Sequence, residues 1–219
     1  EIGFNLRKMF EDLSEALSIR AYKKGLGFLS FLDTDIPTDL KGDPGRLRQV
    51  FMNLVGNALK FTSKGKIFIN GKKIKETSDR VSIRFEVIDT GIGISPEKQN
   101  SVFDSFSQAD GSTTRKYGGT GLGTTISKQL VETMGGEIGL DSKLGEGSKF
   151  WFTINLKKQE SKAGKDSATD IDLKGLNVLI VDTSKTHRYI TSKYLEAFGC
   201  KVMEAQSGDD ALMILNKSI

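Results

Sequence analysis

The spacing of hydrophobic positions changes several times along the chain, and each change predicts a new element. Residues 4–24 begin as a short extended segment and continue with apolar side chains every three or four positions, as in an amphipathic helix. Residues 26–33 alternate between apolar and polar, as a half-buried strand does. After a loop, helical spacing returns and predicts a second helix over 44–61, with Asp43 as its N-cap.

The following segments predict a hairpin-rich sheet and one further long helix. We expect two strands, over residues 67–75 and 81–89, and then a short helix over 96–103. A longer helix over 125–134 should end at Gly135-Gly136, and a final hairpin should follow over 137–156. Residues 105–124 are polar and glycine-rich and have no periodicity. They therefore predict a long mobile loop, of the kind that often carries function.

A change of composition after residue 156 predicts a second domain. Residues 157–172 are polar and nearly free of large apolar side chains, so we interpret them as a linker that follows a first domain over 1–156. Residues 173–219 are predicted to form strand, helix, strand and helix, a partial flavodoxin-like segment. Two parallel strands should not be stable alone, so we expect this part to pack on the first domain, exchange with another chain or be disordered.

Composition narrows the class of protein. Of the 219 residues, 37% are hydrophobic and 27% are charged, which is typical of a globular protein. The net charge of +4 is too small to predict binding to nucleic acid. The single cysteine, Cys200, excludes an internal disulfide framework and fits a reducing, cytoplasmic location. The chain starts at Glu1 without a signal peptide or membrane span, so we expect an excerpt of a longer protein, with or without an anchor elsewhere.

One face of the predicted second helix is polar in an uncommon way. Its members, at helical spacing, are Arg46, Gln49, Asn53, Asn57 and Lys60. A solvated face would explain the stripe, but Asn and Gly are poor choices there, and Gly56 lies in the middle of this helix. An amide oxygen can instead ligate Mg²⁺, and a lysine one turn further on can meet a phosphate.

Two glycine-containing segments add candidate chemistry. Asp89 follows a predicted strand, and Gly91 and Gly93 allow the backbone to turn sharply there; an ordinary strand-turn with a glycine bulge is equally compatible. A carboxylate in this place can accept a hydrogen bond from an exocyclic amine such as that of adenine. The segment KYGGTGLGTT, residues 116–125, precedes a helix, whose free N–H groups and dipole favour an anion. It matches neither the dinucleotide fingerprint nor the P-loop, and a flexible linker is its alternative interpretation.

In combination the motifs are far more specific. Their order, Asn53-x₃-Asn57-x₂-Lys60, then Asp89-x-Gly91-x-Gly93, then FDSFSQAD, then Gly119-x-Gly121-x-Gly123, resembles the catalytic ATP-binding domain of sensor histidine kinases, within the GHKL superfamily of gyrase-like, MutL-like and chaperone ATPases. The resemblance covers nearly all of residues 4–156. It implies an α/β (α+β) two-layer sandwich, with a mixed sheet and helices on one face, and ATP between the helices and a lid.

The same resemblance implies roles for individual residues. Asn57 would be the Mg²⁺ ligand, Asn53 would help to place metal and phosphates, and Lys60 and Arg115 would meet phosphate oxygens. Asp89 would bind the adenine amine. The remaining residues implied at the nucleotide are Phe61, Gly91, Gly93, Ile94, Phe103, Tyr117, Gly119, Thr120, Gly121, Leu122, Gly123 and Thr125, and Phe106 completes the phenylalanine motif.

Two departures from the family pattern matter. Thr124-Thr125 stands where the family usually has Leu-Ser, so Thr124 replaces an apolar packing residue while Thr125 can still donate a hydrogen bond or cap a helix. Residues 173–219 resemble the start of a response-regulator receiver, but Asp182 is followed by Thr183 instead of a second acidic residue. The phosphate-accepting aspartate of such a domain would lie beyond Ile219, so we expect no phosphate transfer to this segment.

The resemblance therefore implies a hybrid sensor histidine kinase that passes the γ-phosphate of ATP to a histidine on an absent upstream dimerisation domain. Its partners would be ATP, that dimerisation domain, a receiver domain or response regulator, and a second copy in a full-length homodimer. The only histidine, His187, is interpreted as a surface or interface residue. Two alternatives stay open: an ATP hydrolase, which would need a glutamate where this chain has Asn53, and a non-catalytic scaffold module.

Overall fold

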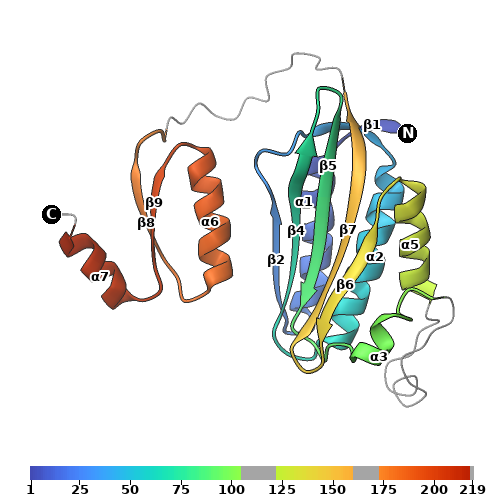
Figure 1. Ribbon diagram of the computed structural model, residues 1–219. Coiled ribbons are helices and arrows are strands. Elements are labelled where there is room, and N and C mark those ends of the chain that lie inside the picture. Colours follow the sequence, from blue (N-terminus) through green and yellow to red (C-terminus); the bar gives the residue numbers. More distant parts are fainter. Residues whose placement is uncertain (105–121, 160–172, 218–219) are drawn as a thin grey trace. The chain divides into compact units, whose positions relative to one another are not determined.

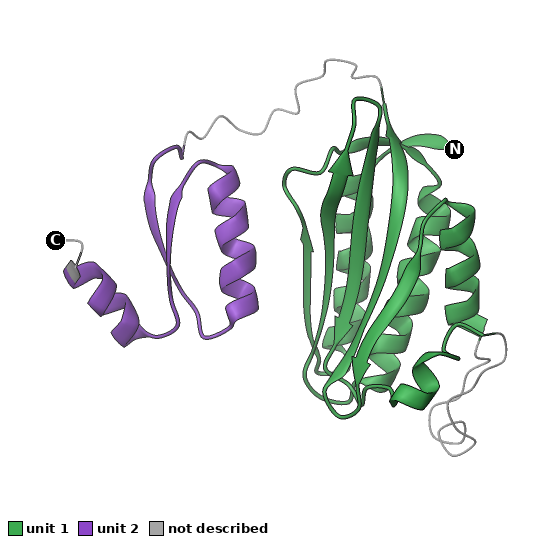
Figure 2. Cartoon of the chain, viewed as in Figure 1, with its two compact units in different colours: residues 1–161 green, residues 162–219 purple. Residues whose placement is uncertain are grey.

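The sequence folds as two separate sheets with their own helices, in a computed structural model that describes residues 1–104, 122–159 and 173–217. The two compact units are Glu1–Ser161 and Lys162–Ile219, coloured separately in Figure 2. None of the described helices is long and apolar enough to cross a membrane.

The first unit is a two-layer sandwich, in which helices cover one face of a mixed sheet (Figure 1). The strand order is β1-β3-β7-β5-β4-β2, with β6 also paired to β7; only β2 and β4 are parallel. The elements are β1 (Ile2–Asn5), α1 (Leu6–Tyr22), β2 (Gly27–Leu32), β3 (Asp39–Gly42), α2 (Pro44–Phe61), β4 (Lys66–Glu76), β5 (Arg80–Asp89), α3 (Pro96–Gln99), α5 (Leu122–Thr133), β6 (Ile138–Lys143) and β7 (Gly147–Lys158). The predicted fold class is confirmed.

Alternation along β5 shows how the sheet separates its two faces. Val81, Ile83 and Phe85 are fully buried and face the helices, whereas the intervening side chains lie on the other face. On that other face the Arg84 guanidinium stacks over the ring of Trp151, 4.1 Å from its centroid. The period of two therefore places the hydrophobic core between β5 and its neighbours on one side and the helices on the other.

An aromatic cluster joins the helices to the sheet. Phe51 of α2 packs edge-on against Phe10 of α1, Phe85 of β5 and Phe152 of β7, with ring centroids 5.8, 5.2 and 5.3 Å away. Because all four rings are buried, Phe51 is the point at which two helices and two strands meet.

Helix α2 begins as the sequence predicts. The Asp43 side chain accepts a hydrogen bond from the backbone N–H of Arg46 at 3.0 Å, and Pro44 occupies the first turn, where its missing N–H costs nothing. The Asp43 carboxylate also pairs with the Arg46 side chain at 3.0 Å.

Four boundaries differ from the prediction. Helix α3 ends at Gln99, whereas the expected short helix continued to Phe103. Strand β3 was expected to be loop, because its four residues are too short to show a period. Strand β7 continues to Lys158, two residues into the expected linker, because its end still pairs with β3. Helix α5 begins at Leu122, three residues before the expected start at Thr125.

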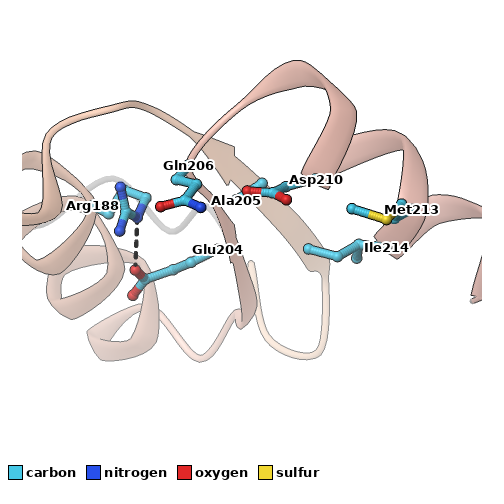
Figure 3. Close-up of a pocket in the computed structure, with 7 residues that line it drawn as sticks. All are labelled: Arg188, Glu204, Ala205, Gln206, Asp210, Met213 and Ile214. Carbon is cyan, nitrogen blue, oxygen red and sulfur yellow. Dashed lines mark hydrogen bonds and ion pairs between the residues drawn. The ribbon is translucent and has the colours of Figure 1, made fainter.

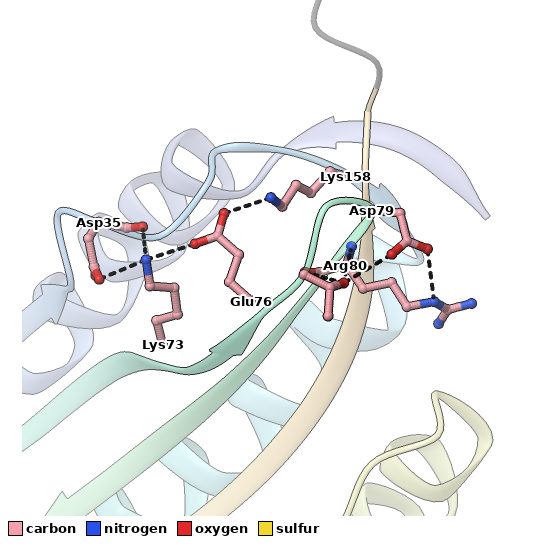
Figure 4. Close-up of polar contacts among 7 residues, drawn as sticks. Asp35, Lys73, Glu76, Asp79, Arg80 and Lys158 are labelled. Carbon is pink, nitrogen blue, oxygen red and sulfur yellow. Dashed lines mark hydrogen bonds and ion pairs between the residues drawn. The ribbon is translucent and has the colours of Figure 1, made fainter.

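The end of β7 is also held by charge (Figure 4). Lys158 Nζ lies 2.7 Å from Glu76 Oε1, and Lys73 Nζ bridges Glu76 and Asp35 at 2.8 and 2.9 Å. Hydrogen bonds from Lys158 and Lys73 lower the pKa of Glu76 to about 2, so this carboxylate remains ionised until the pH falls well below 4.5. These contacts explain why lysines that look like linker belong to the fold.

The second unit has the strand–helix–strand–helix order that the sequence predicts. It consists of β8 (Asn177–Val181), α6 (Lys185–Ala197), β9 (Lys201–Ala205) and α7 (Gly208–Lys217), and its two strands are parallel. A shallow pocket of about 340 Å³ near the carboxyl end of β9 is lined by Arg188, Glu204, Ala205, Gln206, Asp210, Met213 and Ile214 (Figure 3).

We expect Phe51→Ala to lower the free energy of unfolding of the first unit by about 3–5 kcal/mol, and Phe51→Leu by about 1 kcal/mol. The reason is that Phe51 contacts both layers at once. Denaturant unfolding followed by the fluorescence of Trp151, the single tryptophan, measures this unit. Tyr22→Ala, which alters a side chain 83% exposed, is the control and should change the value by less than about 0.5 kcal/mol.

Candidate nucleotide-binding site

The polar stripe of α2 is where the sequence places it. The apolar side of the helix lies in the core, while Asn53, Asn57 and Lys60 are half-buried on another side. The Asn57 side chain makes no hydrogen bond within the described part of the chain, so its amide oxygen is available to a ligand. A Cβ added at Gly56 would meet no described atom within 4 Å, so packing does not explain this glycine. A ligand that lies against the helix at this position would explain the glycine.

The carboxylate predicted to bind adenine is buried at the end of β5. Asp89 is only 7% exposed, and its Oδ1 accepts a hydrogen bond from the backbone N–H of Gly91 at 2.8 Å. Burial raises the pKa of Asp89, an effect that backbone N–H groups of Gly91 and Ser148 partly oppose. A carboxyl group kept in so dry a place is a functional-site candidate.

A second polar atom lies beside Asp89. The Thr62 hydroxyl helps to lower the pKa of Asp89, yet it is buried and meets the geometry of a hydrogen bond with no described residue. Buried hydroxyls are normally paired, and an orphan of this kind is satisfied by a ligand or by water. Thr62 follows directly after α2, so the end of this helix and the end of β5 form one corner.

Gly91 and Gly93, the two glycines after Asp89, are required because neighbouring backbone atoms leave no room for a Cβ at these positions. A Cβ at Gly91 would lie 2.6 Å from the carbonyl oxygen of Phe61 and 2.8 Å from Asp89 Oδ1. Gly93 has a φ of +67°, and a Cβ there would collide with the carbonyl oxygen of Lys143. The turn is therefore pressed against both the end of α2 and the β6–β7 hairpin, which is more specific than an ordinary glycine bulge.

The first turn of α5 contacts the middle of α2. The Asn53 side-chain Nδ2 donates to the carbonyl oxygen of Gly123 at 3.2 Å and to Ser127 Oγ at 3.3 Å. Thr125 lies inside the helix and not at its cap, and its buried hydroxyl has no hydrogen-bond partner among the described residues. The expectation that Thr125 caps this helix is therefore wrong, while its role as a donor stays a prediction.

The segment before residue 105 is fixed to the core and to α5. The ring of Phe103 packs edge-on against Phe150, with centroids 6.2 Å apart. Thr124 Oγ1 donates to the carbonyl oxygen of Val102 at 2.7 Å, so the threonine that replaces an apolar family residue makes a polar contact instead. Ile94 is held by its backbone N–H, which donates to Ser142 Oγ at 2.8 Å.

Several predicted residues cannot be placed. Those that lie outside the described residues are Phe106, Arg115, Tyr117, Gly119, Thr120 and Gly121. Of the others, Leu122 and Gly123 begin α5, and the ring of Phe61 lies 4.8 Å from Lys60 Nζ.

Helix α2 thus connects the two ends of a nucleotide-sized site. Asn53 adjoins the start of α5, Phe61 adjoins Asp89, and Asn57 lies midway, one turn from each. At 1.5 Å per residue the distance from Asn53 to Phe61 along the helix is about 12 Å. The site offers a buried acceptor at one end and amide groups beside a helix N-terminus at the other, which suits a base and an anionic group respectively.

In the second unit, the carboxylate that a receiver would use for metal is already occupied. Asp182 Oδ1 accepts from the backbone N–H of Ser184 at 2.6 Å, and Oδ2 lies 3.2 Å from His187 Nδ1. The described residues contain no group of three or more His, Cys, Asp or Glu side chains able to hold a metal ion. His187 is exposed, as predicted.

Residues 42–158 match the family model of histidine kinase-, DNA gyrase B-, and HSP90-like ATPases. The chain belongs to this family. It is 43% identical over 202 residues to sensor protein GacS of Pseudomonas syringae pv. syringae, covering 92% of this chain and 22% of that protein. It is 36% identical over 231 residues to hybrid signal transduction histidine kinase K of Dictyostelium discoideum, covering 99% of this chain and 19% of that protein.

A solved structure resembles this chain over most of its length. The crystal structure of full-length ShkA in complex with AMPPNP matches 97% of this chain and 42% of that one, with a TM-score of 0.76 and 30% identity. The predicted relationship to sensor histidine kinases is confirmed. The chain spans about a fifth of the length of these curated relatives.

Sequence reasoning missed three polar residues at the site: Thr62, Ser127 and Ser148. Each is buried: Thr62 directly follows α2, Ser127 lies within α5 and Ser148 lies within β7. For Ser127, a usable signal was present, because a serine three to four residues after the last motif glycine falls on the same face of a helix as that glycine.

We expect Asp89→Asn to abolish binding of adenine nucleotides without lowering the thermal stability of the nucleotide-free protein. Since burial raises the folded pKa of Asp89, its contribution to stability falls as the pH rises from the unfolded value of about 3.9 through the folded pKa. The amide removes this cost, so at pH 7 the free energy of unfolding should be at least as large as that of the wild type.

Denaturant unfolding of both proteins between pH 4 and pH 7 measures this difference, which should shrink as the pH is lowered. A variant that is less stable than the wild type at pH 7 would show that Asp89 is a structural residue and contradict its assignment to the site.

Proposed function

We propose that the first unit binds ATP with Mg²⁺ and transfers the γ-phosphoryl group to a histidine on a dimerisation domain of the same kind of protein, as a sensor histidine kinase does. The observation that carries this proposal is the corner formed by Asp89 and Thr62, where a carboxylate that is only 7% exposed lies beside a buried hydroxyl. The match to a solved kinase with a bound ATP analogue supports it.

Binding would proceed along α2. Asp89 accepts a hydrogen bond from the exocyclic amine of adenine, and the glycines beside it leave room for the flat base. Lys60 lies one turn from Asn57 and supplies a positive charge for phosphate oxygens, and Arg115 is proposed to add a second. The N-terminus of α5 contributes free backbone N–H groups on the same side as Asn53.

The residues present fit a magnesium ion bound mainly through phosphates. Mg²⁺ usually takes only one or two protein ligands in nucleotide sites, and the amide oxygens of Asn57 and Asn53 are ligands of the type it prefers. When bound, the ion would neutralise charge on the phosphates. The protein itself holds the triphosphate in line for attack by the acceptor nitrogen, so that the bond to phosphorus forms as ADP leaves.

We propose that the second unit is a receiver-like domain, so that the chain belongs to a hybrid kinase that works in the cytoplasm as a homodimer. The similarity to a hybrid histidine kinase of Dictyostelium, over 99% of this chain, supports the hybrid arrangement. Because the Asp182 carboxylate is tied to Ser184 and His187, this unit is proposed to exchange no phosphate by itself. A receiver domain or response regulator is the proposed destination of the phosphate.

Hydrolysis of ATP is the weaker alternative. It requires a carboxylate on α2 to activate water, and this helix contains no Asp or Glu. Asn53 cannot act as a base, because its amide is neutral and its Nδ2 is engaged with α5. A purely structural module is disfavoured by Asp89, because burial of this carboxylate disfavours its charged form, a cost that a scaffold has no reason to carry.

We expect Asn57→Ala to weaken binding of AMP-PNP in the presence of Mg²⁺ at least 10-fold, since it removes the amide proposed to hold the ion. Isothermal titration calorimetry measures the affinity. Met52→Ala, on an exposed part of the same helix, is the control and should leave it unchanged. Undiminished affinity of the Asn57 variant would overturn the assignment of this stripe to the phosphate end of the site.

The chain by itself should not form phosphohistidine. Its only histidine pairs with Asp182 in the second unit, and the proposed acceptor lies on another domain. Incubation with labelled ATP should therefore give no acid-labile label, whereas adding a histidine-bearing dimerisation domain should give it. Labelling of His187 in the chain alone would contradict the proposed acceptor.

A further inference from the structure

We infer that Ser127 is a positioning residue that fixes the orientation of the Asn53 amide, so that the amide oxygen of Asn53 is directed to the nucleotide and its ion. This inference rests on the proposed function, because it assigns a cause to the geometry of that same site. Ser127 is fully buried, at 0% exposure, and therefore acts through Asn53 and not by touching a ligand.

The hydrogen bonds around Ser127 form a closed set. Ser127 Oγ donates its proton to the carbonyl oxygen of Gly123 at 2.8 Å. Asn53 Nδ2 approaches both atoms of this pair, with distances of 3.2 Å to the Gly123 oxygen and 3.3 Å to Ser127 Oγ. Because these two acceptors, in the first turns of α5, lie only 2.8 Å from each other, one N–H of the Asn53 amide is shared between them.

This arrangement decides which end of the amide faces α5. A carbonyl oxygen can only accept, and a serine hydroxyl whose proton is already donated can only accept as well. Turning the Asn53 amide by 180° would place its oxygen against these two acceptors and remove the hydrogen bonds that both accept from Asn53. The nitrogen must therefore face α5, and the oxygen is left for the other side of the amide.

The orientation matters because only the oxygen is useful to a cation. An amide oxygen can ligate Mg²⁺, whereas an NH₂ group in its place would repel the ion. Partners that orient a metal ligand from behind commonly change metal affinity by 10- to 100-fold when they are removed. Ser127 would have this effect without any contact with the phosphates.

A simpler explanation is that Ser127 only bonds back along its own helix, as serines and threonines often do. Helix α5 supplies the comparison for this explanation. Thr133 Oγ1 donates to the carbonyl oxygen of Gln129 at 2.7 Å in the same i to i−4 pattern, but it is exposed. Of these two hydroxyls, only that of Ser127 also accepts a hydrogen bond from α2. A comparison of substitutions at Ser127 and Thr133 therefore separates the effect of losing the bond within the helix from the effect of losing the contact with Asn53.

The test compares the wild type, Ser127→Ala, Asn53→Ala, the double variant and Thr133→Ala by calorimetric titration with AMP-PNP, in MgCl₂ and in EDTA. We expect Ser127→Ala to weaken binding about 10-fold with Mg²⁺ and less than about 2-fold without it. The double variant should bind no more weakly than Asn53→Ala, since Ser127 acts through Asn53. Thr133→Ala should match the wild type.

Equal losses with and without Mg²⁺, or a full further loss when Ser127→Ala is added to Asn53→Ala, would show a merely structural role and overturn the inference. If Ser127→Ala does not fold, Ser127→Cys keeps the volume with a much weaker acceptor, and the same pattern is expected. Failure of the wild type to bind AMP-PNP would overturn the proposed function instead.

A second measurement needs no nucleotide. It therefore tests the role of Ser127 even if the proposed function is wrong. In the nucleotide-free protein, the side-chain NH₂ protons of Asn53, assigned by their absence in Asn53→Ala, should exchange with solvent several-fold faster in Ser127→Ala than in Thr133→Ala. Unchanged exchange in Ser127→Ala would overturn the inference whatever the nucleotide data show.

Discussion

The rotation of α2 about its own axis is the constraint on which the site depends. Phe51 meets three other buried rings, and this contact fixes which side of the helix faces the sheet. Asn53 and Asn57 are then turned toward the site because they lie about 200° and 240° further round the helix than Phe51. A small rotation of α2 that changed the packing of Phe51 would also move both amides. The packing of the core therefore determines where the side chains of Asn53 and Asn57 lie.

Much of the fold was visible in the sequence because its long elements have strong periods. The second helix was predicted with its bounds, since Asp43 and Pro44 mark its start and its apolar stripe ends with Phe61. Strand β3 could not be predicted: its four residues owe their conformation to pairing with β1 and with the end of β7, which are distant in sequence. The extension of β7 depends on the same pairing.

Single residues of the candidate site could be proposed from the sequence, but the contacts between them could not. Asp89 stood out because a carboxylate after an apolar strand is uncommon, but its burial follows from the β6–β7 hairpin pressing on Gly93, which no local pattern reveals. The hydrogen bonds between Asn53 and α5 join residues about 70 positions apart. Helix–helix contacts of this kind depend on how the helices pack, and a spacing rule describes only one helix at a time.

The hydrogen bond between Thr124 and the carbonyl oxygen of Val102 has a consequence for sequence variation. It ties the first turn of α5, which also accepts from Asn53 of α2, to the segment that ends at Asp104. A substitution of Thr124 that removes the hydroxyl should therefore loosen one of the two contacts that hold this turn, and leave the contact with α2 to hold it alone.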